Sequence, residues 1–136
     1  MIKAVSHVHV WVLDQESAKA FYTEKLGFEV KTDRRTEDGF RWITVHAVHQ
    51  PDVVLVLGEI GPPMIAEHQA AKLRELVAMG TFGVGVLRTD DCRATYRELV
   101  GKGVEFLEEP QRRPYGVEAV LRDDSGNWFA LTEAAP

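Results

Sequence analysis

Apolar and polar residues alternate along the first part of the chain. Residues 4–13 read Ala-Val-Ser-His-Val-His-Val-Trp-Val-Leu. A period of two predicts a strand with two different faces. The valine face is suited to pack under a helix, whereas His7, His9 and Trp11 together suit a pocket wall.

A helix and three more strands are predicted to follow. Asp14 offers a helix N-cap, apolar residues recur at helical spacing after it, and Gly27 ends the pattern. Strands are then expected over residues 28–32, 41–48 and 52–57, with a polar turn over 33–39. The first module is therefore predicted as βαβββ.

The same order returns after a predicted helix over residues 64–79. A strand is predicted over 84–87. A helix should follow, with its N-cap at Asp90 or Asp91, apolar residues at helical spacing, and its end at Gly103. Strands follow over 104–107, 117–121 and 128–132, with a loop over 110–114. Asp14–Gly27 and Asp90–Gly103 have the same separation, which favours a repeat. We predict a single α+β domain: module one over 4–58, a helical connector over 59–80 and module two over 81–133.

Composition and charge narrow the class of protein. The chain has 136 residues, a formal net charge of −5 and a single cysteine. A negative charge argues against nucleic-acid binding, and no apolar run approaches the ~20 residues of a membrane span. One cysteine allows no internal disulfide. These features lead us to expect a cytoplasmic protein with no nucleic-acid or membrane partner.

Three motifs resemble one family. His7 and Asp14 precede Phe-Tyr at 21–22 and Leu-Gly-Phe at 26–28, Leu99 precedes Gly-Val at 103–104, and Asp-Asp-Ser-Gly-Asn spans 123–127. This set is similar to the vicinal oxygen chelate superfamily, which contains glyoxalases, bleomycin-resistance proteins and extradiol dioxygenases. The resemblance implies two βαβββ modules that form a cup-shaped mixed sheet, and it implies a homodimer.

The family's enzymes hold a divalent metal with side chains from the first and last strand of each module. Carried over by resemblance, one ligand falls on His7, and its counterpart falls on Gly83 or Val84. The last strands offer only apolar residues, namely 54–56 in module one and Ala130 in module two. A lone histidine binds a divalent ion weakly, so no metal or other cofactor is expected. The alternative is a shifted site in which His7 and Glu118 converge with His9 or His46.

Two functions remain open. The first is a metal-independent small-molecule-binding protein similar to the bleomycin-resistance branch, and the second is a metal-dependent enzyme of glyoxalase (lyase) or extradiol dioxygenase type. No catalytic residue is assigned. The candidate ligand-binding residues combine histidines, tryptophans and polar groups near the predicted cup: His7, His9, Trp11, His46, Arg113, Tyr115, Glu118 and Trp128. Each also has a plainer explanation, as core packing for the tryptophans and as solvated strand or loop residues for the others.

Overall fold

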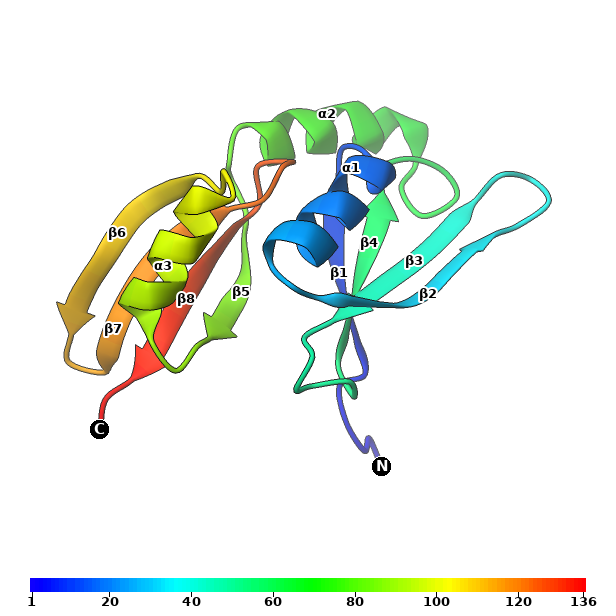
Figure 1. Ribbon diagram of the computed structural model, residues 1–136. Coiled ribbons are helices and arrows are strands. Elements are labelled where there is room, and N and C mark those ends of the chain that lie inside the picture. Colours follow the sequence, from blue (N-terminus) through cyan, green and yellow to red (C-terminus); the bar gives the residue numbers. More distant parts are fainter.

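The computed structural model describes residues 1–136 and contains two four-stranded sheets and three helical regions (Figure 1). The first half contains β1 (His7–Val12), α1 (Gln15–Ala20), the π-helical turn η1 (Phe21–Lys25), β2 (Glu29–Arg35), β3 (Arg41–His46) and β4 (Val54–Glu59). The connecting helix is α2 (Glu67–Ala78). The second half contains β5 (Gly83–Arg88), α3 (Cys92–Gly101), β6 (Phe106–Arg113), β7 (Gly116–Arg122) and β8 (Trp128–Ala134).

The two halves have the same strand order. It is β1-β4-β3-β2 in the first sheet and β5-β8-β7-β6 in the second. In each sheet the first and last strands of the half pair in parallel, and the other neighbours are antiparallel. The predicted α+β fold with two βαβββ units is therefore confirmed.

The helix ends explain why the repeat can be read from the sequence. The Asp14 carboxylate accepts a hydrogen bond from the Ser17 amide at 2.8 Å, and Asp91 accepts one from the Ala94 amide at 2.9 Å. Asp91, and not Asp90, is thus the second cap, which makes this helical segment one residue shorter than the first. The π-helical turn η1 accommodates the extra residue of the first segment.

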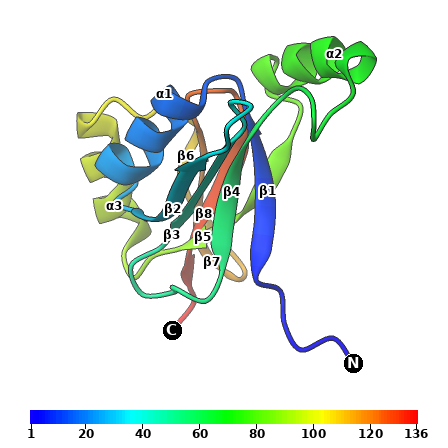
Figure 2. The ribbon, with the colours of Figure 1, turned by 90° about the vertical axis from the view of Figure 1, so that its right-hand side faces the viewer.

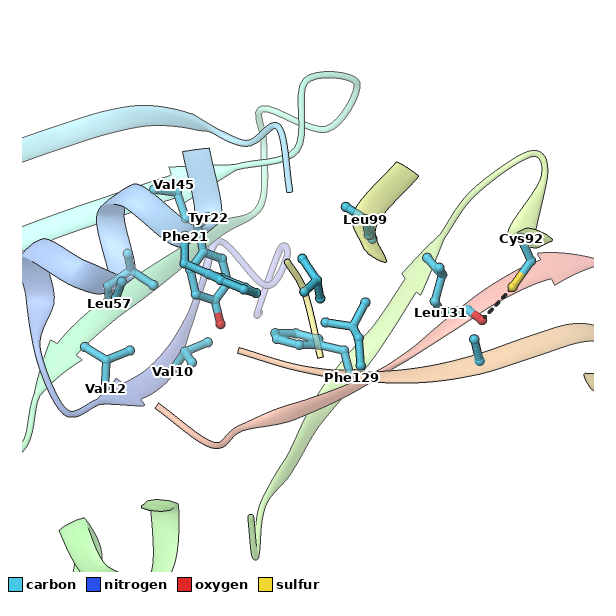
Figure 3. Close-up of a cluster of buried hydrophobic side chains, with 14 of the residues drawn as sticks. Val10, Val12, Phe21, Tyr22, Val45, Leu57, Cys92, Leu99, Phe129 and Leu131 are labelled. Atoms are coloured by element: carbon cyan, nitrogen blue, oxygen red, sulfur yellow. Dashed lines mark hydrogen bonds between the residues drawn. The ribbon is translucent and has the colours of Figure 1, made fainter. Parts of the chain in front are cut away.

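One apolar core joins the two halves. The valine face of β1 packs in it, since Val10 and Val12 are each 1% exposed. Tyr22 and Phe129 come from different halves, and their rings lie 6.3 Å apart (Figure 3). Cys92 is also buried in this core, and burial raises the pKa of its thiol. Helices α1 and α3 lie on one side of the sheets and α2 on the other (Figure 2).

Three predicted boundaries are wrong. Strand β2 continues to Arg35 into the predicted turn, and α2 begins at Glu67 instead of residue 64. Strand β6 continues through Pro110, where a loop was expected. Proline lacks a backbone donor but is tolerated here because β6 is an edge strand with a register shift between Glu108 and Gln111.

Candidate functional site

The face of the first sheet that points away from α1 carries a row of rings. His7, His9 and Trp11 alternate with the valines of β1, of which Val10 and Val12 are buried in the core, so their side chains project from the other face. The His9 ring stacks on Trp11 with centroids 5.2 Å apart. The centroid of the Trp42 ring, on β3, lies 6.0 Å from that of His9 and 6.1 Å from that of His7. We call His7, His9, Trp11 and Trp42 the aromatic face.

Small side chains form the floor of the aromatic face. Leu55 and Leu57 of β4 pack against the helix-side core, so Val54 and Val56 point the other way. Thr44 of β3 is paired with Val56 in the sheet. Val54 and Val56 are each 2% exposed and Thr44 is 1% exposed, which indicates that the larger rings close over them.

Trp11 lies flat on the sheet because its neighbour on β4 is a glycine. Trp11 and Gly58 are register partners, and a Cβ built on Gly58 would lie 2.7 Å from Trp11 Cζ3. The indole also packs against the small apolar cluster under α2, which contains Ile60 and Val77. Trp11 thus connects the aromatic face to the connecting helix.

His46 lies at the far end of β3 from Trp42. Its Nδ1 is 2.9 Å from the Ala47 carbonyl oxygen, and its Nε2 is 3.9 Å from Glu29 Oε2. His46 therefore shares the sheet face with Trp42 by parity but has its own local partners. No ring contact joins it to His7 or His9.

The second sheet has a corresponding open face. Phe129 and Leu131 pack in the helix-side core, so Trp128 and Ala130 point away from it. The Trp128 indole lies against Gly83, where an added Cβ would be 2.3 Å from Trp128 Cζ2. Val86 pairs with Ala130 on this face and is 67% exposed.

The polar candidates of the second half gather around the turn between β6 and β7. The Tyr115 hydroxyl donates to Glu118 Oε1 at 3.1 Å. Partial burial, and then this hydrogen bond, raise the pKa of Tyr115. Arg113 forms an ion pair with Glu108 of the same edge strand, β6. These side chains lie at the opposite end of the second sheet from Trp128, which pairs with Arg122.

The structure thus divides the eight candidates between two sheets. His7, His9, Trp11 and His46 belong to the first, and Arg113, Tyr115, Glu118 and Trp128 to the second. No group of three His, Cys, Asp or Glu side chains that could hold a metal ion lies together in the chain. The predicted shifted set of His7, Glu118 and either His9 or His46 therefore does not form within one chain.

Comparison with known proteins supports the family resemblance. Residues 4–131 match the model of the Glyoxalase/Bleomycin resistance protein/Dioxygenase superfamily. The chain belongs to this superfamily. Among solved structures, UcmS2 is 52% identical with a TM-score of 0.94, and the match covers 98% of this chain and 100% of UcmS2.

Two further relatives are more distant. TnmS3, an antibiotic binding protein from Streptomyces sp. CB03234, is 32% identical with a TM-score of 0.77 over 98% of each chain. YetH, an uncharacterized protein from Bacillus subtilis (strain 168), is 32% identical over 98% of this chain and 100% of its own. No helix of this protein is long and apolar enough to cross a membrane.

The residues at the superfamily's metal positions do not fit a metal ion. His7 is the one side-chain donor among them, and its Nδ1 is 2.8 Å from Ser6 Oγ. Gly83 and Val84 have no donor, and the Trp128 indole lies against Gly83. Ala130 likewise has no donor and is 9% exposed. One nitrogen ligand would leave the dehydration of a divalent ion largely uncompensated.

Several residues of the site were missed as candidates from the sequence. Trp42, Thr44 and His46 alternate with apolar residues in the sequence, and this alternation is a usable signal that Trp42 shares a sheet face with His46. Gly58 and Gly83 gave no signal, because their role depends on which tryptophan lies beside them across a strand pair. The buried floor at Val54 and Val56 reads in the sequence as an ordinary apolar strand.

Proposed function

We propose that this protein binds and sequesters a flat, largely aromatic small molecule of the antibiotic type, without transforming it. The observation that carries the proposal is the aromatic face. Four adjacent rings cover a buried apolar floor on a sheet face that no helix of the chain fully covers. Stacked and edge-to-face rings give a flat ligand favourable contacts.

Two lines of support come from outside this face. TnmS3, which is named an antibiotic binding protein, is similar to this chain over nearly its whole length. The metal positions of the superfamily's enzymes hold apolar residues here, apart from His7. The function therefore corresponds better to the bleomycin-resistance branch than to a glyoxalase or dioxygenase.

A second copy of the chain completes the ligand site in this proposal. The ring-bearing candidates of the first sheet and the polar candidates of the second do not meet within one chain. A homodimer would let the second sheet of one copy cover the first sheet of the other. Val86, exposed on the second sheet, would then be buried between copies.

Tryptophan fluorescence tests ligand binding. Bleomycin and an anthracycline serve as first probes, because each contains a planar aromatic system. A bound probe should quench or shift the emission, since Trp11 and Trp42 lie in the aromatic face. Trp11→Phe should remove a large part of the change. A change of the same size in the variant would argue against this face as the site.

Light scattering tests the dimer. The chain has a mass of 15.3 kDa, and a homodimer should show twice that mass. Val86→Asp places a charge on the open face of the second sheet and should shift the mass to that of one chain. Val100→Asp is the matched control, because Val100 is 46% exposed on α3, which covers the other side of the sheets. A monomeric wild-type protein would contradict the shared site.

A further inference from the structure

The edge strand β2 carries a cation beside the aromatic face. Arg34 is the register partner of Trp42, and directly opposed residues of an antiparallel pair project from the same face of the sheet. The preceding residue, Asp33, points to the other face, where its carboxylate pairs with Arg41 and with Lys19 of α1. Arg34 therefore projects from the same side of the sheet as Trp42, away from α1.

The guanidinium of Arg34 is available to a ligand. Arg34 is exposed, and none of the ion pairs within the chain includes it. Glu29 lies on the same face at the other end of β2, where its Oε2 is 3.9 Å from His46 Nε2. The edge of the aromatic face at Trp42 thus carries an uncompensated positive charge, although the chain has a formal net charge of −5.

A guanidinium opposite an indole favours one kind of ligand. The Trp42 side chain is partly exposed, so a flat ring system can stack on it. Directly opposed side chains have Cβ atoms about 5 Å apart, and an arginine stem is long enough to bring its guanidinium to the edge of a ring stacked on the indole. The planar fork of donors on arginine matches a carboxylate or another anionic oxygen.

We propose that Arg34 selects flat aromatic ligands that carry an anionic oxygen, as a carboxylate or an ionised phenol, at one edge. The rings lie against Trp42, and the anionic oxygen accepts hydrogen bonds from the Arg34 guanidinium. This inference rests on the proposed function and adds to it a specificity-determining residue and a charge preference. A neutral ring system still binds to the aromatic face, but more weakly.

Calorimetric titration at pH 7 with two matched probes tests the proposal. 2-Naphthoate carries an anionic carboxylate, and 2-naphthamide has the same rings and a similar shape without the charge. We expect 2-naphthoate to bind about 3- to 10-fold more tightly, because a hydrogen bond to a charged group is stronger than a neutral one, although solvent weakens it at an exposed arginine. The negative net charge of the protein by itself would produce the opposite preference.

Neighbouring arginines on opposite faces of β2 provide a matched pair of variants. Arg34→Gln should remove the preference, so that the two probes bind equally, and should keep the wild-type mass in light scattering. Arg35→Gln is the control, because it makes the same change in net charge. Arg35 is the register partner of Arg41, which lies on the side of α1. This control should leave the ratio of the two affinities as in the wild type.

Several results would overturn the inference. A preference that survives Arg34→Gln, or one that Arg35→Gln removes equally, would show that Arg34 is not the selecting group. A fall in mass in Arg34→Gln would assign the residue to a contact between copies. Equal affinity of the two probes in the wild-type protein would remove the role of Arg34 but leave the proposed function standing. Absence of binding by both probes would also remove it, and the fluorescence titrations with antibiotics test the proposed function separately.

Discussion

At the scale of single residues, two glycines determine how the tryptophans lie. Gly58 provides the space under Trp11, and Gly83 provides it under Trp128. In both cases the glycine and the tryptophan are register partners on neighbouring parallel strands. A side chain at either glycine would lift the indole from the sheet and change the shape of the ligand face.

Gly58→Ala should destabilise the protein by about 1–3 kcal/mol, because the added methyl overlaps the Trp11 ring and forces it to move. Urea denaturation measures the change in the free energy of unfolding. Gly101→Ala is the control, since an added Cβ there meets nothing within 4 Å and alanine is the better helix former. Equal stabilities for Gly58→Ala and wild type would show that the indole is not held in this position.

His7 is the residue on which any metal chemistry would depend. We expect zinc, nickel, manganese and iron(II) to bind no more tightly than micromolar, because His7 supplies the single side-chain donor at the superfamily's metal positions. Calorimetry on tag-free protein measures this, with His7→Ala as the comparison. Submicromolar binding of one ion per site that is lost in His7→Ala would favour an enzyme that uses His7 with Glu118.

At the scale of elements, an ion-pair network holds α1 against β2 and β3. Arg41 is 7% exposed, and its Nε and Nη2 both donate to the Asp33 carboxylate at 2.8 Å. Arg41 also pairs with Glu16 of α1, and Lys19 of α1 pairs with Asp33. The hydrogen bonds from Arg41 are the main reason that the pKa of Asp33 lies well below its usual value.

Asp33→Asn should cost about 2–4 kcal/mol at pH 7, because it leaves the Arg41 charge poorly compensated. Asp33 has a lower pKa in the folded state than in the unfolded state. Its stabilising contribution is therefore complete above about pH 4, the usual carboxyl value, and is lost as the pH falls towards the folded pKa. The stability difference between wild type and variant should shrink below pH 4 in denaturation series. A constant difference down to pH 2 would contradict this role.

The elements differ in how well the sequence predicts them. Strand β1 was predicted together with both faces, because strict alternation follows from one buried and one open side. Strand β6 was cut short, since its edge position and its register shift, which make Pro110 acceptable, are properties of the sheet and leave no local pattern. The sequence repeat was found, but it was aligned at Asp90, whereas Asp91 is the N-cap. The alignment is off by one residue because the π-helical turn adds one residue to the first helical segment.

At the scale of the whole molecule, the turn between β7 and β8 forms hydrogen bonds that join the second half to the first. The Tyr22 hydroxyl donates to Asp123 Oδ2 at 2.7 Å, and burial is the main cause that raises the pKa of Tyr22. The Ser125 hydroxyl accepts from the Leu13 amide at 2.9 Å. Asp123 itself is held by backbone amides of its own turn.

Tyr22→Phe should lower the free energy of unfolding by about 1–2 kcal/mol, because a buried hydrogen bond to a charged group is lost while the ring packing remains. Thermal unfolding followed by calorimetry measures it. Tyr96→Phe is the control, since the Tyr96 hydroxyl lies 3.4 Å from Glu109 at the surface. Equal losses in the two variants would show that this contact does not fasten the halves together.

The candidate site could be predicted only in part, because some of its features are local in the sequence and others depend on distant segments coming together. The alternation in β1 indicates His7, His9 and Trp11 on one face, and this pattern is local. The pocket between β1, α2 and β5 is lined by Leu73, Phe82 and Asn127, which come from separate segments that meet only in the folded chain. In the proposed dimer, Glu118 would meet the aromatic face of the second copy, and single-chain patterns do not describe such a contact.

In the proposed function, the protein holds a flat aromatic small molecule and releases it unchanged. Equilibrium dialysis against bleomycin and an anthracycline, followed by mass spectrometry of the recovered probe, tests it most directly. We expect saturable binding of at least one probe at micromolar concentration or below, and an unaltered mass after hours with excess protein. Absence of saturable binding by either probe, or recovery of a chemically altered one, would contradict it.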